Sequence, residues 1–129
     1  MKPGAAVPVW PPIAGFYTMQ LVRGGVRVAV RIWEGPPVIE GEELDRSPRW
    51  CCEIDGRTDR LERDDEAGYL CRVPLEIDRA WPYCAGTPIT ESEYRYLLAH
   101  AEWARTHNPE HPRAQPRKAV DFNTLPMRF

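Results

Sequence analysis

Long apolar runs are absent from this 129-residue sequence, and so are the short motifs that mark many catalytic sites. No stretch approaches the ~20 apolar residues of a transmembrane helix, so the sequence predicts no contact with the membrane interior. There is no GxxxxGK[ST], GxGxxG, HExxH or GxSxG, which argues against phosphate-loop, dinucleotide-binding, zinc-protease and esterase chemistry. The acidic groups Glu42-Glu43 and Asp64-Asp65-Glu66 lie in predicted loops with arginines nearby, which indicates solvated charge rather than metal or acid–base chemistry. We therefore predict a protein that is not an enzyme.

Metal ligands at the usual spacing are also missing. Structural zinc is commonly held by cysteines or histidines separated by two to four residues. The cysteines are Cys51, Cys52, Cys71 and Cys84, without a CxxC, and the three histidines lie downstream of them. We predict no metal and no other cofactor, with the cysteines as buried or half-buried free thiols. Catalysis by Cys71 or Cys84 would need a neighbouring base, which the sequence does not reveal.

Lysine is scarce, with two residues against 15 arginines, a bias typical of GC-rich coding sequences. The net charge is −2, but residues 1–33 carry +4, residues 34–82 carry −7 and residues 83–129 carry +1. No segment forms a broad basic field, which disfavours tight sequence-independent binding to DNA. The first 15 residues lack the apolar run of a signal peptide. We therefore expect a single cytoplasmic domain with reduced thiols.

Two β-rich runs at the start of the chain predict a hairpin. Residues 16–23 and 26–33 flank Gly24-Gly25, a pair that tolerates the positive φ angles of a tight turn. Alternate residues of the second run face opposite sides of the sheet. The apolar face carries Val26, Val28, Val30 and Ile32, and the basic face carries Arg27, Ala29, Arg31 and Trp33.

Shorter strands are expected in the middle of the chain. Residues 34–48 are rich in glycine, proline and acid and are predicted to form a loop. The runs at 49–54, 57–62 and 69–77 are typical of three further strands, separated by polar turns. Residues 78–88 are expected to form a connector that leads to a helix.

A helix is predicted at residues 90–107. Thr90 and Glu93 form a capping-box pattern at its start, and Asn108-Pro109 ends it. Its apolar stripe consists of Tyr94, Leu97, Leu98, Ala101 and Ala104.

Together these elements predict an α+β fold. An antiparallel sheet of four to five strands, or a partial barrel, is expected to pack against the one C-terminal helix. The β-rich part is residues 16–77, and residues 1–15 and 108–129 are expected to be extended arms. Val120, Phe122, Leu125 and Met127 indicate that the C-terminal arm packs on the body.

A second stripe on the predicted helix consists of Tyr96, His100, Trp103 and His107, spaced by four, three and four residues. Residues at these spacings lie on one helical face. One interpretation is a helix with two buried sides, and another is an aromatic surface that binds a partner. A metal site is disfavoured because His100 and His107 lie two turns apart.

Two other groups of residues are candidate binding surfaces. Basic and aromatic residues on a β-surface hold single-stranded nucleic acid in some folds, through phosphate pairing and base stacking. That group contains Tyr17, Arg23, Arg27, Arg31 and Trp33. The second group is acidic and contains Glu40, Glu42, Glu43 and Asp45, which would suit a basic partner by charge complementarity. Ordinary solvated charge explains both groups as well.

Four segments resemble a family of small proteins encoded by phages and prophages of GC-rich proteobacteria. These segments are "GFYTMQLVRGGVRVAVRIW", "LDRSPRW", "WPYCAGTPITESEYRYLLAHAEWARTHNPEHP" and "PRKAVDFNTLPMRF". The resemblance covers most of residues 15–129 and is weakest at 55–80. The family carries no catalytic motif, so no site residue is transferred from it.

The resemblance implies a phage-type accessory protein in a bacterial cytoplasm. The first hypothesis is a non-catalytic module that binds a host or phage protein complex, most specifically an inhibitor of a host defence complex like an anti-CRISPR. The second is a single-stranded nucleic-acid-binding domain of phage replication or recombination. The third is a structural or assembly component of the phage particle.

Overall fold

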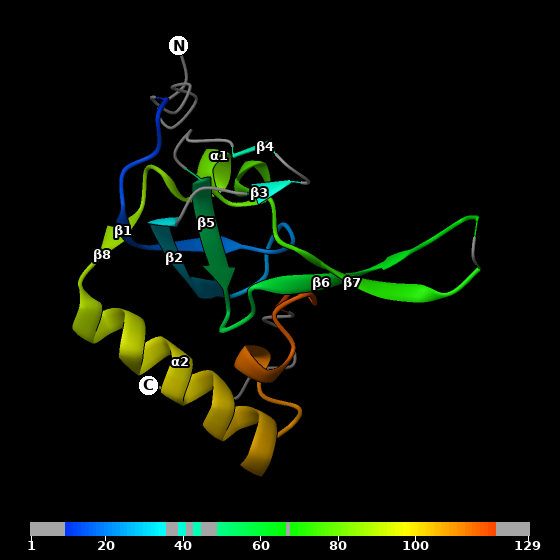
Figure 1. The fold of residues 1–129 in the computed structure, drawn as a ribbon. Helices are drawn as coiled ribbons and strands as arrows, with labels where there is room; N and C mark the ends of the chain where they lie inside the picture. Colours follow the sequence, from blue (N-terminus) through cyan, green and yellow to red (C-terminus); the bar gives the residue numbers. More distant parts are fainter. Residues whose placement is uncertain (1–9, 36–38, 41–42, 45–48, 67, 121–129) are drawn as a thin grey trace, which may run out of the picture.

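The computed structural model describes residues 10–35, 39–40, 43–44, 49–66 and 68–120. Its main feature is an open antiparallel sheet with the strand order β5-β2-β1-β8 (Figure 1). The strands are β1 (Gly15–Gln20), β2 (Arg27–Gly35), β5 (Arg49–Ile54) and β8 (Pro88–Ile89). The predicted α+β class is confirmed. The sheet does not close into a barrel.

The β1–β2 hairpin has a wider turn than predicted. Gln20 pairs with Arg27, so six residues rather than two connect the strands. Gly24 has a φ of 80°, which favours glycine. A Cβ atom on Gly25 would lie 2.9 Å from the carbonyl oxygen of Pro116, because the C-terminal segment crosses the turn. The glycine pair therefore provides room for the tail as well as a turn.

One face of the sheet forms the main core with a short helix. Trp81 and Cys84 of α1 (Trp81–Cys84) are buried against this face, and the Trp81 ring meets the Tyr17 ring edge-on at 5.4 Å. The buried strand residues of this core are Tyr17, Met19, Val28, Val30, Ile32 and Cys52. The predicted apolar face of the second strand is thus confirmed for Val28, Val30 and Ile32.

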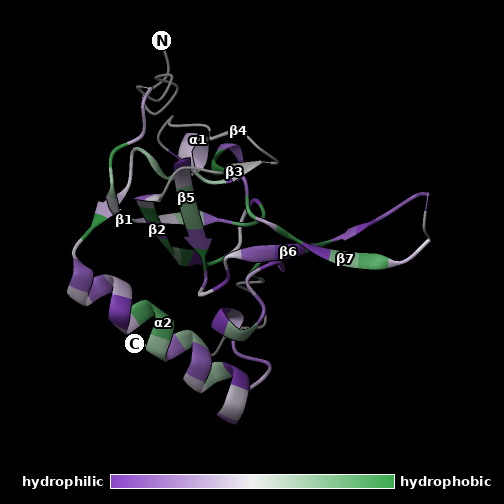
Figure 2. Ribbon diagram, viewed as in Figure 1, coloured by the Kyte–Doolittle hydropathy of each residue, from purple (hydrophilic) through white to green (hydrophobic). Residues whose placement is uncertain are grey.

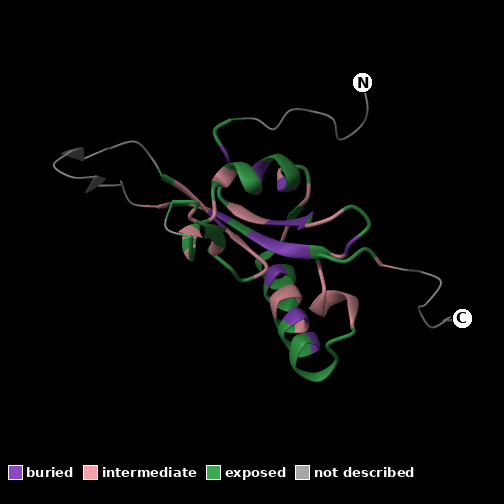
Figure 3. Ribbon diagram, turned by 90° about the vertical axis from the view of Figure 1, so that its right-hand side faces the viewer, coloured by how far each residue is buried: buried purple, intermediate pink, exposed green. Residues whose placement is uncertain are grey.

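The long helix α2 (Glu91–His107) lies across the opposite face (Figure 3). Its predicted capping box is present, since Thr90 and Glu93 exchange hydrogen bonds. The Tyr94 ring packs on Phe16 at 4.7 Å, and the Tyr94 hydroxyl donates to Glu53 of β5. Residues Tyr94, Ala101 and Ala104 are buried. Figure 2 shows the hydrophilic and hydrophobic stretches that alternate along α2 as a result.

The sheet differs from the prediction in which strands it contains. Among the described strands, β6 (Asp59–Arg63) and β7 (Leu70–Pro74) pair with each other and not with the sheet, and they project from the body as a separate hairpin (Figure 1). Asp55 and Gly56 both have positive φ angles, and this predicted turn leads the chain away from the sheet. The fourth place in the sheet belongs to β8, which begins at the last residue of the predicted connector.

Three segments predicted to lack regular structure contain short elements. The acidic loop holds a two-residue pair, β3 (Ile39–Glu40) with β4 (Glu43–Leu44). The connector holds the 3₁₀ helix η1 (Ile77–Arg79) and α1. The C-terminal segment is not fully extended, because η2 (Pro112–Ala114) follows α2.

The C-terminal segment packs on the body, as predicted, through its described part. The Arg113 side chain donates to the Arg27 carbonyl at 3.1 Å, and the Val120 N–H donates to the Gly24 carbonyl at 3.0 Å. Phe122, Leu125 and Met127 lie outside the described residues, as do residues 1–9 of the predicted N-terminal arm.

Replacement of Ile32 by alanine should destabilise the fold by about 2–5 kcal/mol, the usual range for a buried isoleucine. Ile32 is 1% exposed at the centre of the core. The matched control is Ile13→Ala, because Ile13 is 63% exposed and a surface change is expected to stay within about 0.5 kcal/mol. Urea denaturation measures both, and equal losses would contradict the assignment of the core.

Candidate functional site

The second stripe of α2 is divided between exposed and half-buried residues. Tyr96 is 64% exposed and Trp103 is 49% exposed, and His107 is also exposed. His100 lies between them and is half-buried. Of the two interpretations, a helix with two buried sides therefore does not fit three of the four residues. These three residues face outwards because the opposite side of α2, with Tyr94, Ala101 and Ala104, packs on the sheet.

Ring contacts hold this stripe in a fixed arrangement. The rings of Trp103 and His107 are stacked, with centroids 5.5 Å apart and an interplanar angle of 17°. His111, just before η2, meets the His100 ring at 5.1 Å and the Trp103 ring at 6.5 Å. We call Tyr96, His100, Trp103, His107 and His111 the aromatic surface. The sequence did not predict His111 as a member because it lies beyond the helix.

His111 also supports the turn that follows α2. Its Nδ1 accepts a hydrogen bond from the Arg113 N–H at 3.1 Å, which caps η2. Burial lowers the pKa of His111, and His100 and Arg113 lower it further. The Nδ1 of His100 is buried and has no hydrogen-bond partner among the described residues. A neutral His111 therefore fits this environment better than a charged one.

The predicted basic and aromatic β-surface is not assembled as one site. Tyr17 is buried on the opposite face of the sheet, where its hydroxyl donates to the Ile13 carbonyl, so its inclusion was wrong. Arg27 is bound to Thr18 and Thr87. Arg31 lies over the Trp33 ring at 5.0 Å. Arg23 is exposed in the turn between β1 and β2.

The acidic group is described only in part. Glu40 lies in β3 and Glu43 pairs with it from β4. Glu42 and Asp45 lie outside the described residues. The placement of the acidic group as a partner surface stays a prediction.

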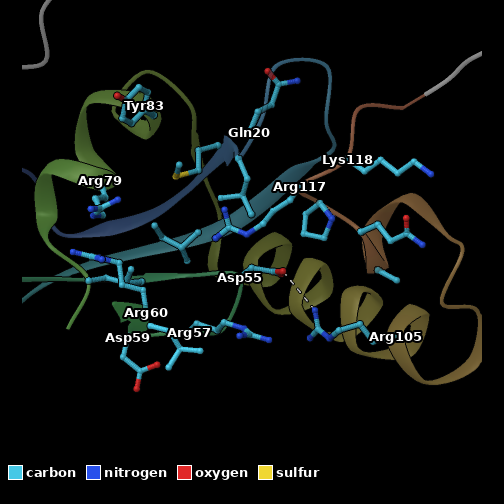
Figure 4. Close-up of a pocket in the computed structure, with 18 of the residues that line it drawn as sticks. Gln20, Asp55, Arg57, Asp59, Arg60, Arg79, Tyr83, Arg105, Arg117 and Lys118 are labelled. Carbon is cyan, nitrogen blue, oxygen red and sulfur yellow. Dashed lines mark hydrogen bonds and ion pairs between the residues drawn. The ribbon is translucent and has the colours of Figure 1, made fainter. Parts of the chain in front are cut away.

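A cleft of about 1110 Å³ lies between the β6–β7 hairpin, η1, the C-terminal segment and the end of α2 (Figure 4). Seven basic residues and three acidic residues line it, which leaves the cleft four charges positive. The basic residues are Arg57, Arg60, Arg72, Arg79, Arg105, Arg117 and Lys118. The acidic residues are Asp55, Asp59 and Asp78. We call this the basic cleft.

The basic cleft was not predicted from the sequence. Its arginines come from separate segments, and the segment 34–82 that supplies four of them has a net charge of −7. The arginines of the cleft show no regular spacing in the sequence, because they come together only when the hairpin and the C-terminal segment fold towards each other.

The buried thiols are poor nucleophiles. Burial raises the pKa of Cys84 to about 12 and that of Cys52 to about 11. A thiol reacts as its thiolate, so these two side chains remain protonated and inert at neutral pH. Cys51 and Cys71 are half-buried, and all four cysteines are free of disulfides.

Comparison with known proteins adds no relative. No family model, curated protein or solved structure matches this chain.

Within the part of the chain that the structure describes, no three histidine, cysteine or acidic residues are grouped as metal ligands would be. No helix in the same part has the length and apolar character needed to cross a membrane.

His111 should make stability fall in mild acid. Its pKa is depressed in the folded state, so its contribution is complete above the unfolded value of about 6.5 and is lost as the pH falls through the folded value. His111→Asn retains a side-chain acceptor for the Arg113 N–H and removes the titration. We expect the variant to lose less stability than the wild type between pH 7.5 and pH 5.5 in urea titrations. An equal loss of stability in His111→Asn and in the wild type over this pH range would contradict this role.

The four thiols should fall into two classes in titration with a thiol reagent at pH 8. Cys51 and Cys71 are expected to react in the native protein, whereas Cys52 and Cys84 react only after unfolding. Cys84→Ser should leave the native count unchanged, and Cys71→Ser should lower it by one. Native reaction of all four thiols would show that the core is more open than described.

Proposed function

We propose that this protein is a non-catalytic, phage-type accessory protein that binds and inhibits a host defence protein complex, as anti-CRISPR proteins do. The observation that carries the proposal is the exposure of Trp103 and Tyr96 on one side of α2. Large aromatic side chains are enriched among the residues that dominate protein–protein binding energy. The phage context comes from the sequence resemblance alone.

The aromatic surface has the order that a binding surface needs. A capping box fixes the start of α2, and buried residues fix its inner side on the sheet. Trp103 is held by the stacked His107 ring and the edge of His111. A surface that is ordered before binding loses less side-chain entropy on association.

The spacing of the exposed residues suits a protein partner. Tyr96 and Trp103 lie two turns apart on one helical face, and His107 follows one turn after Trp103. This spacing is the pattern by which a helix is recognised in a groove. Burial raises the thiol pKa values of Cys52 and Cys84, which argues against these two side chains as nucleophiles.

Expression of the protein in a bacterium with active CRISPR immunity should restore plaque formation by a targeted phage. Trp103→Ala should reduce that effect, since loss of a central tryptophan weakens binding by about 2 kcal/mol or more, roughly 30-fold. Trp10→Ala is the matched control, because Trp10 is 61% exposed and lies outside α2. Plaque counts with and without each variant measure the effect.

Two results would contradict the proposal. In one, the wild-type protein leaves plaque counts unchanged across the CRISPR types tested. In the other, Trp103→Ala and Tyr96→Ala inhibit immunity as well as the wild type does, which would exclude the aromatic surface as the site of binding.

A further inference from the structure

We propose that the basic cleft binds the sugar–phosphate backbone of single-stranded nucleic acid. This site is separate from the aromatic surface and adds a second ligand to the proposed protein partner. It also differs from the basic β-surface considered from the sequence, because Arg23, Arg27 and Arg31 do not line the cleft.

The charge of the cleft is not neutralised by its own acids. Arg72 pairs with Asp59 at 3.0 Å, and Arg105 pairs with Asp55 at 3.5 Å. These pairs leave Arg57, Arg79, Arg117 and Lys118 against the one remaining carboxylate of the cleft, Asp78. Arg60 pairs with Glu62, which does not line the cleft, so an excess positive charge of three remains once this pair is also counted, in a chain whose formal net charge is −2.

Several guanidinium groups in the cleft have donors to offer. Among the described residues, the side chains of Arg57, Arg79 and Arg117 have neither a hydrogen-bond partner nor an ion-pair partner. The Nε of Arg60 is buried without a hydrogen-bond partner, although its terminal nitrogen pairs with Glu62. A planar guanidinium matches the geometry of a phosphate group and binds it with two parallel hydrogen bonds.

The arginines surround the cleft rather than covering a flat face. Figure 4 shows Arg79 on η1 and Arg60 on β6 on one side, with Arg117 on the C-terminal segment and Arg105 on α2 on the other. A cavity in which one sign of charge predominates concentrates the field between its low-dielectric walls. An extended anion that passes between these walls would meet guanidinium groups on both sides.

The size of the cleft and its aromatic residue favour a nucleic acid over a small anion or an acidic peptide. Its volume of about 1110 Å³ exceeds the roughly 300–1,000 Å³ of small-molecule sites, which suits an oligomer. Tyr83 lines the cleft and is 65% exposed, so its ring is available to stack on a base. Bases in a duplex are already stacked, and this favours a single strand.

Fluorescence anisotropy with fluorescein-labelled dT12 and rU12 tests the proposal. We expect binding at 50 mM NaCl that weakens with salt. The slope of log K against log salt should be about −2, as for three phosphate contacts to a single strand at roughly −0.7 each. The two oligonucleotides distinguish DNA from RNA as the source of the backbone.

The combined variant Arg57→Gln, Arg79→Gln and Arg117→Gln should weaken binding at least about tenfold at 50 mM NaCl and flatten the salt slope. Among the described residues these side chains make no hydrogen bond or ion pair, so its melting temperature should stay close to that of the wild type. Arg95→Gln is the matched control, since Arg95 pairs with Glu91 on α2 and does not line the cleft. The single variants Arg79→Gln and Arg117→Gln serve if the combined variant does not fold.

Tyr83→Ala should weaken oligonucleotide binding about fivefold or more and leave the salt slope unchanged, because stacking carries no charge. Three outcomes would overturn the proposal: no binding at 50 mM NaCl, equal loss of binding in Arg95→Gln, or tighter binding of a duplex than of dT12. Displacement of dT12 by poly-L-glutamate at equal charge concentration would also overturn it, and would assign the cleft to an acidic protein segment.

Discussion

Coverage of the β1–β2 hairpin on both faces is the constraint on which the rest of the structure depends. Val28, Val30 and Ile32 of β2 face the core with α1, while Ala29, between them in sequence, is buried on the other face, which α2 covers. A one-residue shift of β2 would turn Arg27 and Arg31 towards the core and move Val28, Val30 and Ile32 out of it. The pairing of β1 with β2 therefore also positions both helices.

The two candidate sites lie on the outside of the unit that the β1–β2 hairpin forms with the helices covering it. The aromatic surface is the side of α2 turned away from the sheet, and η2 folds back so that His111 contacts it. The basic cleft lies where the β6–β7 hairpin leaves the sheet and the C-terminal segment returns to it (Figure 1). Arg105 of α2 reaches Asp55 in the cleft, so the helix contributes to both surfaces from its two sides.

Local signals in the sequence predicted the elements well. The capping box at Thr90, the end of the helix at His107 and the alternation along β2 depend on neighbouring residues, and the structure has all three. The partnership of strands depends on contacts between distant residues. Nothing in residues 57–74 showed that β6 and β7 would pair apart from the sheet, and nothing in Pro88–Ile89 showed that this pair would join it.

The candidate sites were harder to predict for the same reason. The spacing of Tyr96, His100, Trp103 and His107 placed them on one helical face, but exposure depended on where the tail lay. Tyr17 was assigned to the wrong face of the sheet, because aromatic residues near arginines say nothing about which side they occupy. The basic residues of the cleft come from four separate segments, so the net charge of any one stretch of sequence does not reveal them.

The contact between Gly25 and the carbonyl of Pro116 links a turn to the geometry of a distant wall. Pro116, Arg117 and Lys118 line the cleft, and Pro116 can approach so closely because position 25 carries only a hydrogen atom. Even a methyl group there would push this strip of backbone outwards. The width of the cleft thus depends on Gly25, a residue about ninety positions earlier in the chain that does not itself line the cleft.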